Sequence, residues 1–98
     1  MKIRVAKEEK TVTFHIEGRI DTETAPSLGK EINKVISKCE KLTLDLRKTE
    51  YITSAGLRVI LAAFKEMKSR GDMKIINASP IIKEIFDMTG FSEIVDVD

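Results

Sequence analysis

Ser54 is the residue whose type and position could do chemistry, since it lies two residues before Gly56 in a predicted strand-to-helix turn. A serine followed by glycine at such a turn is half of the nucleophile elbow of serine hydrolases. Ile52 stands where the first glycine of that motif would let the turn tighten. The single histidine, His15, falls on the polar face of a distant predicted strand, so no general base is expected near the hydroxyl. The sequence therefore argues against a hydrolase.

Two other roles fit Ser54. Its hydroxyl is typical of a helix N-cap, where a side-chain oxygen accepts a hydrogen bond from an early backbone N–H. A hydroxyl in a loop at the end of a strand is also accessible to a kinase, and a phosphate of about −1.5 to −2 charges would lie beside the positive end of the helix dipole. Residue type favours the cap, and the two roles are compatible. Asp21 has a similar double interpretation, as a cap or Asx-turn residue or as an exposed carboxylate near Ser54.

The composition excludes several other kinds of site. One cysteine and one histidine in 98 residues can supply neither an internal disulfide nor a four-ligand zinc site, and the five glycines stand apart from one another, so no nucleotide-binding loop is present. Cys39 is expected in the core. Seventeen basic and sixteen acidic residues give a net charge of +1 without basic clusters, which indicates no nucleic-acid or membrane partner. No apolar run approaches the roughly 18 residues of a membrane span, so we expect a cytoplasmic protein.

The first elements that must position Ser54 are two strands and a helix. Residues 11–17 alternate between apolar and polar and predict a strand that Gly18 ends, with Ile3 and Val5 in an antiparallel partner and residues 8–10 as the turn. A helix is expected to begin near Pro26, with Asp21, Thr22 and Thr24 offering cap oxygens. Its predicted apolar stripe consists of Ala25, Leu28, Ile32, Val35, Ile36 and Cys39.

The second half of the chain repeats a strand-and-helix order. Residues 41–46 predict a strand followed by a polar turn at 47–50, and residues 57–70 predict a helix. The buried residues expected on that helix are Leu57, Ile60, Leu61, Phe64 and Met67. A short strand at 73–76, a helix with Ser79 as its cap and Pro80 at its first position, a stop at Thr89 and Gly90, and an edge strand with Ile94, Val95 and Val97 complete the order. Phe91 is expected to close the last helix end rather than to form an exposed contact.

This order predicts one mixed-sheet α/β domain over residues 1–98, with helices packed on a largely parallel sheet behind a leading β-hairpin. Ligands and partners of such sheets meet the carboxyl ends of the strands. The loops at 18–24, 49–56 and 77–80 are therefore the expected functional edge.

Three segments of the chain together resemble STAS domains, and in particular anti-sigma factor antagonists. The main segment runs from Asp45-Leu46-Arg47 to Tyr51-Ile52-Thr53-Ser54-Ala55-Gly56-Leu57-Arg58-Val59-Ile60-Leu61. The others are Gly18-Arg19-Ile20-Asp21 and Ser79-Pro80 with Ile85-Phe86-Asp87-Met88-Thr89-Gly90-Phe91. The resemblance covers about residues 11–97 and implies a mixed sheet with helices against it.

The resemblance also implies a regulatory role rather than an enzyme. In the family, the unphosphorylated antagonist binds an anti-sigma factor, and this binding frees the sigma factor. The anti-sigma factor is itself a Ser/Thr kinase that phosphorylates the antagonist, and a phosphatase later removes the phosphate. The phosphoacceptor corresponds to Ser54, and the family's strand-end acidic residue corresponds to Asp21. The implied partner-binding residues are Asp21, Thr53, Ser54, Ala55, Gly56 and Arg58. The nucleotide and magnesium belong to the kinase, so the resemblance implies no cofactor for this chain. We expect the chain to be a monomer when free.

The chain departs from the family pattern in ways that leave alternatives open. Many antagonists have an acidic residue before the phosphoacceptor and a serine after it, where this chain has Thr53 and Ala55. Thr53 is therefore an alternative acceptor, although its position fits the motif less well. Longer members continue into a further helix beyond the position of Asp98. The alternative function is that of a small STAS subunit bound to the ATPase of a phospholipid transporter, where the equivalent hydroxyl is often threonine.

Overall fold

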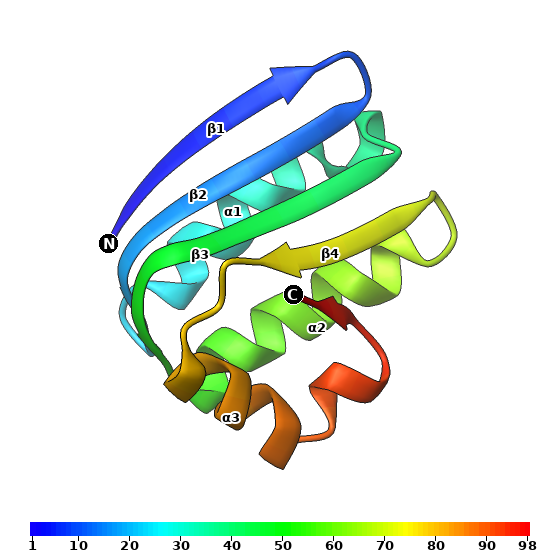
Figure 1. Cartoon of the computed structure of the whole chain (residues 1–98). Coiled ribbons are helices and arrows are strands. Elements are labelled where there is room, and N and C mark those ends of the chain that lie inside the picture. The colour runs from blue at the N-terminus through cyan, green and yellow to red at the C-terminus, as the bar shows by residue number, and fades with distance from the viewer.

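The five strands form one sheet in the order β1-β2-β3-β4-β5 in the computed structural model, which describes all 98 residues (Figure 1). β1 (Lys2–Glu8) pairs antiparallel with β2 (Thr11–Ile20). β3 (Lys41–Ile52), β4 (Asp72–Ile76) and β5 (Asp96–Val97) then add in parallel. The predicted mixed sheet with a leading hairpin is confirmed.

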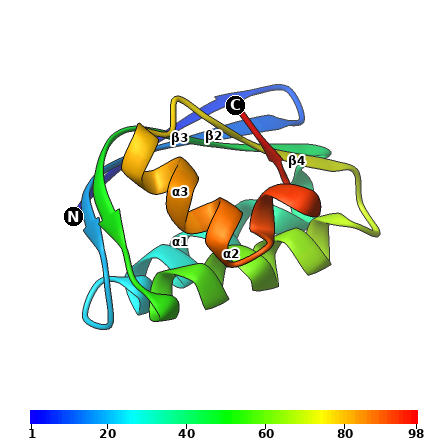
Figure 2. The same cartoon turned by 60° about the horizontal axis from the view of Figure 1, so that its bottom comes forward.

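The helices leave one face of the sheet open. α1 (Ala25–Val35) and α2 (Ser54–Met67) lie side by side beneath the sheet, and α3 (Pro80–Met88) packs near the end of β3 (Figure 2). Two short 3-10 helices, Ile36–Lys38 and Phe91–Glu93, follow α1 and α3. The face opposite α1 and α2 is called the open face below.

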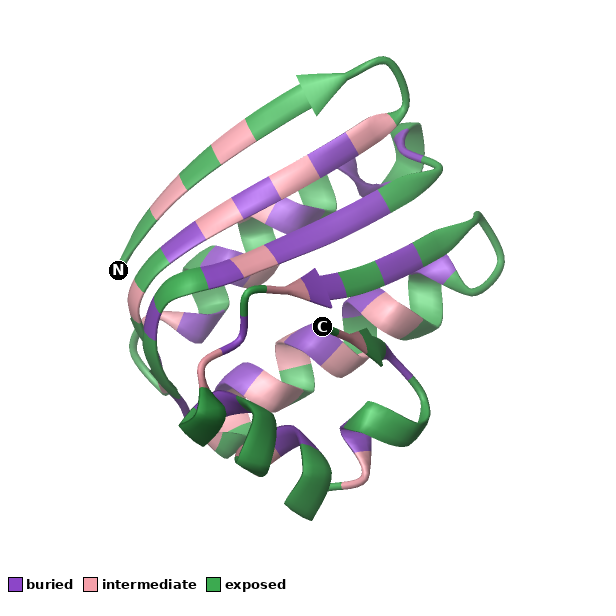
Figure 3. Ribbon diagram, in the orientation of Figure 1, coloured by how far each residue is buried: buried purple, intermediate pink, exposed green.

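The core lies between the sheet and the helices, and alternation along the strands builds it (Figure 3). The inward residues of the two central strands are Val12, Phe14, Ile16, Leu42, Leu44 and Leu46, and all are buried. The predicted stripe of the first helix is also buried, Cys39 included. On α2 the prediction is partly wrong, because Gly56 and Ala63 are buried while Leu57, Leu61 and Phe64 are only half-buried. The small residues let α2 approach the sheet, so the larger side chains flank the contact.

The strands that lead to the functional edge are longer than the sequence predicts. Gly18 does not end β2, which continues to Ile20, and residues 47–50 are not a turn, because β3 continues to Ile52. The pairing of β2 with β3 shifts register between His15 and Glu17 and again after Gly18. Such bulges add residues to one strand and bend it. Gly18 has a φ of +100°, which glycine adopts readily, so the residue shapes the strand without breaking it.

The remaining differences lie at element ends. The predicted helix at 57–70 begins and ends three residues earlier, at Ser54 and Met67. The final strand contains only Asp96 and Val97, because residues 91–93 form a 3-10 turn and Ile94 is exposed. Phe91 is buried with its ring centroid 5.7 Å from that of Phe86, which confirms that it closes the end of α3. Ser79 caps α3 as predicted, with Pro80 at the first helical position.

Candidate functional site

The carboxyl ends of β2 and β3 place two loops beside each other. The backbone N–H of Thr53 donates to the carbonyl oxygen of Ile20 over 2.9 Å, and the Thr53 hydroxyl reaches the same oxygen at 3.4 Å. Asp21 and Ser54 are the residues that follow this bonded pair. The two predicted loops, 18–24 and 49–56, are therefore joined through the backbone at the ends of β2 and β3.

Gly56 sets how closely α2 approaches this edge. A Cβ atom at Gly56 would lie 2.7 Å from Cγ2 of Ile20, 2.9 Å from Cγ2 of Ile52 and 3.0 Å from the Ile20 carbonyl oxygen. Real Cβ atoms do not come this near to other atoms, so only glycine fits without a shift of the helix. The glycine two residues after Ser54 thus has a packing function and does not tighten a nucleophile elbow.

Asp21 organises the loop before α1 as an Asx turn. Its Oδ1 atom accepts from the backbone N–H groups of Glu23 and Thr24, both at 3.0 Å. The Thr24 hydroxyl accepts from the backbone N–H of Asp21 and lies 2.8 Å from the carbonyl oxygen of Arg19 and 3.1 Å from the carboxylate. The Thr24 backbone N–H is the main cause that lowers the pKa of Asp21 below its usual range, so the carboxylate stays ionised. No side chain caps α1 itself.

Ser54 is exposed and is the first helical residue of α2. The prediction that it is the N-cap is wrong, because Thr53 holds that position in extended conformation and no side chain caps the helix. The Ser54 hydroxyl forms no hydrogen bond within the chain, whereas the Thr53 hydroxyl is half-buried and bonded to Ile20. Arg58 is exposed one helical turn further on, and Ala55 packs against the core. The edge therefore presents a free hydroxyl and a free cation on one helix face.

Arg19 and Tyr51 extend this edge, although the sequence analysis gave neither residue a role. They are register partners in the β2–β3 pairing, and the Arg19 guanidinium lies 5.2 Å from the centroid of the Tyr51 ring. The Arg19 Nε atom is also 4.0 Å from Oδ2 of Asp21. The Gly18-Arg19-Ile20-Asp21 motif was the signal in the sequence that could have pointed to Arg19. Its pairing with Tyr51 follows from the register shifts between β2 and β3, which the sequence does not reveal.

His15 is not part of this edge. Its Nδ1 atom lies 2.8 Å from Oδ2 of Asp45 on the open face, and the hollow that both residues line does not include Ser54. The single histidine of the chain therefore lies away from the Ser54 surface. No three His, Cys, Asp or Glu side chains are grouped as metal ligands, and none of the helices is long and apolar enough to cross a membrane.

Comparison with known proteins shows the family. The STAS domain family matches residues 2–98. The anti-sigma-B factor antagonist of Bacillus subtilis is 30% identical over 98 residues, which cover 99% of this chain and 90% of that protein. An anti-sigma factor antagonist from Mycobacterium paratuberculosis superposes with a TM-score of 0.90 at 22% identity, over 98% of this chain and 83% of that one. The unphosphorylated anti-sigma factor antagonist SpoIIAA superposes with a TM-score of 0.86 at 16% identity, over 99% and 88% of the two chains.

This chain belongs to the STAS domain family, and its named relatives are anti-sigma factor antagonists, which are regulatory proteins. The resemblance seen in the sequence is confirmed, and the relatives bear out the expected class of function. The phospholipid-transporter alternative gains no support from them. The structural likenesses, at 22% and 16% identity, show the shared fold.

Proposed function

We propose that this chain is an anti-sigma factor antagonist whose binding is controlled by phosphorylation of Ser54. The unphosphorylated chain binds an anti-sigma factor with Ser/Thr kinase activity and thereby releases the sigma factor. Phosphorylation by that kinase ends binding, and a phosphatase restores the free hydroxyl. The chain acts as a cytoplasmic monomer and supplies no cofactor, since the nucleotide and magnesium belong to the kinase.

One observation carries the proposal: the Ser54 hydroxyl is exposed and free of hydrogen bonds at the start of α2, next to the Asp21 loop. A kinase must reach the acceptor oxygen without first breaking an internal bond. Thr53 meets this requirement less well because its hydroxyl is half-buried against the Ile20 carbonyl. Ser54 is therefore the better acceptor of the two.

The physical chemistry of the position suits a switch. No side chain caps α2, so the first-turn N–H groups and the helix dipole favour a phosphate on Ser54, and the fold should survive the modification. The same dianion inside a contact surface meets desolvation and repulsion from the partner. A loss of about 3 kcal/mol weakens binding by more than about 100-fold.

Asp21, Thr53, Ala55, Gly56 and Arg58 complete the proposed contact surface around Ser54. Asp21 and Arg58 are charged groups without a tight salt bridge, so both remain available to a partner. SpoIIAA, which shares the fold, has been solved in a phosphorylated form as well as an unphosphorylated one. Phosphorylation is thus compatible with this architecture.

The test is a pull-down from extract of the native cells with Ser54→Ala and Ser54→Asp baits, followed by mass spectrometry. We expect the alanine bait to retain a small protein with a kinase-type ATPase fold and the aspartate bait to lose it. With that protein purified, the affinity for Ser54→Asp should be about 100-fold lower than for Ser54→Ala. Incubation with ATP should add phosphate to the unaltered chain and to Thr53→Val, but not to Ser54→Ala.

Ser37→Asp is the matched control, because Ser37 is an exposed serine at the opposite end of β3. It adds the same charge and should bind like the unaltered chain. Equal affinities of Ser54→Ala and Ser54→Asp would contradict the switch. A transporter ATPase retained by both baits would replace the antagonist with a constitutive subunit.

A further inference from the structure

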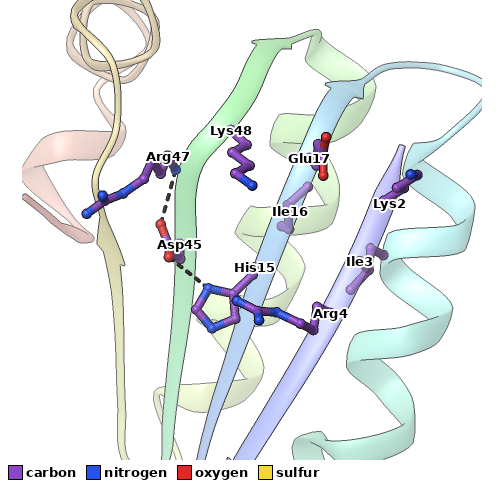
Figure 4. A pocket seen from close by; sticks show the side chains of 9 residues that line it. All are labelled: Lys2, Ile3, Arg4, His15, Ile16, Glu17, Asp45, Arg47 and Lys48. Atoms are coloured by element: carbon purple, nitrogen blue, oxygen red, sulfur yellow. Dashed lines mark hydrogen bonds and ion pairs between the residues drawn. The ribbon is translucent and has the colours of Figure 1, made fainter.

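The open face of the sheet carries a polar hollow of about 620 Å³ that shares no residue with the Ser54 surface (Figure 4). Strands β1, β2 and β3 line it. Its charged lining residues are Lys2, Arg4, Arg47, Lys48, Glu17 and Asp45. None of the four cations has a carboxylate oxygen within 4.0 Å of its side-chain nitrogens. The hollow thus combines an excess of positive charge with cations that have no internal counter-ion.

Strand register brings these cations to one face. Arg4 of β1 is opposite His15 of β2, which is in turn opposite Asp45 of β3. Strict alternation from Asp45 would turn Lys48 toward the helices, since side chains of a strand change face at every residue. The register shift places Lys48 opposite Glu17 instead and returns it to the open face. The bulge in β3 therefore adds a cation to the hollow.

Asp45 does not neutralise these cations, because its own oxygens are already bonded. Oδ2 lies 2.8 Å from Nδ1 of His15, and Oδ1 accepts from the backbone N–H of Arg47 at 3.1 Å and from Nδ2 of Asn77 at 3.0 Å. Desolvation raises the pKa of Asp45, but the hydrogen bonds from Asn77, Arg47 and His15 outweigh it and hold the pKa below its usual range. Glu17 is then the one carboxylate of the lining left to compete for the cations.

His15 adds a directional group to the floor of the hollow. Its side chain is 31% exposed, and Nδ1 is engaged by Asp45 while Nε2 has no partner in the chain. Figure 4 shows the His15 ring between Asp45 and Arg4, with the Lys48 side chain directed toward the space above β2. Because a carboxylate only accepts, Nδ1 carries the proton of this hydrogen bond, and in the neutral ring Nε2 is then an acceptor, suited to a protonated oxygen of a ligand rather than to a bare oxyanion.

We propose that this hollow binds a small polyvalent oxyanion of the diphosphate type, held between Arg4 and Lys48 over β2. Neighbouring strands are about 4.8 Å apart, so β1 and β3 are about 10 Å apart. An anion with two charged groups can reach cations on both strands at once, whereas a single phosphate reaches one side more easily than both. The lining contains no Phe, Tyr or Trp, so the charged groups alone carry recognition.

The test follows backbone amide shifts by NMR while the full chain is titrated with pyrophosphate, inorganic phosphate or citrate at constant ionic strength. Pyrophosphate should bind most tightly and shift the amides of Arg4, His15 and Lys48 most. Arg4→Gln and Lys48→Gln should each weaken pyrophosphate by about 3- to 10-fold. Glu17→Gln should tighten it by about 2- to 5-fold, because a competing carboxylate is removed.

Lys30→Gln is the matched control, since Lys30 is an exposed cation of α1 without an ion pair. It should leave the affinity unchanged. An affinity of Arg4→Gln and Lys48→Gln equal to that of Lys30→Gln, or shifts spread over all lysines, would overturn the site. Citrate binding as tightly as pyrophosphate would overturn the diphosphate assignment. Because Glu17→Gln acts in the opposite direction, a general loss of folding cannot imitate the expected pattern.

Discussion

Two helices of this protein begin at a serine-containing turn after a parallel strand, and the two serines are used differently. Ser79 precedes α3, is half-buried, and its hydroxyl accepts a hydrogen bond from the backbone N–H of Ile82 at 3.4 Å. Ser54 opens α2, is exposed, and its hydroxyl bonds to nothing in the chain. The Ser79 hydroxyl accepts from a first-turn N–H group of its helix, whereas the Ser54 hydroxyl is left free.

The start of α2 is stabilised by groups other than the Ser54 hydroxyl. The Thr53 backbone bonds to Ile20, and Gly56 lets the first turn pack against Ile20 and Ile52. The backbone and the packing therefore fix the position of Ser54 without using its side chain. We therefore expect that Ser54 can be exchanged or charged with little effect on folding, as the proposed modification would require.

Gly56→Ala should lower the free energy of unfolding more than any other change considered for the two helix starts. It disrupts the close packing that positions the first turn of α2 in the absence of a side-chain cap. The new methyl group would meet Ile20 and Ile52 below 3.0 Å, and overpacking of this kind costs about 1–3 kcal/mol. Urea denaturation measures the loss. Gly29→Ala is the control, because its Cβ would meet only Val59 at 3.6 Å and should stabilise α1 by about 0.5–1 kcal/mol. Equal stabilities of the two variants would show that close packing does not hold α2 in place.

Ser79→Ala and Ser54→Ala test the two serines directly. Ser79→Ala removes a cap and should lower the free energy of unfolding by about 1 kcal/mol. Ser54→Ala removes no hydrogen bond and should change it by less than about 0.5 kcal/mol. Thermal and urea unfolding of the pair, measured side by side, gives the difference. A larger loss in Ser54→Ala would mean that its hydroxyl does cap α2 in solution.

The different success of the sequence predictions at the two helix starts has a local cause. At α3, Pro80 fixes which residue is first in the helix, so Ser79 was correctly predicted as the cap. At α2, Thr53 and Ser54 are both good caps and no proline distinguishes them, so the helix start could not be fixed to the residue. Alternation and helical spacing were enough to give the order of the elements and most of the core.

The missed features depend on pairing between distant segments. Gly18 is the only local sign in the sequence of the bulges between β2 and β3. A lone glycine is equally compatible with the end of a strand. The contacts of Arg19 with Tyr51 and of His15 with Asp45 join residues about 30 positions apart. Such pairs follow from strand register, which a single sequence does not define.

Lowering the pH should change the free energy of unfolding least, and it tests the contribution of the Asp21 loop by itself. The pKa of Asp21 is lowered in the folded chain, mainly by the Thr24 backbone N–H, so the unfolded chain binds a proton more readily. The stabilisation from Asp21 is therefore complete above the unfolded pKa of roughly 3.9 and is lost as the pH falls through the lower folded value. NMR titration of the side-chain carboxyl carbon measures that folded value.

Asp21→Asn isolates this contribution, because an asparagine oxygen can still accept the bonds of the Asx turn but does not titrate. At pH 6 the unaltered chain should be slightly more stable than Asp21→Asn in urea. The difference should shrink as the pH is lowered below about 4. A difference that stays constant from pH 6 to pH 3 would mean that the loop next to Ser54 depends on the hydrogen bonds of the Asx turn, which asparagine keeps, and not on the charge of Asp21.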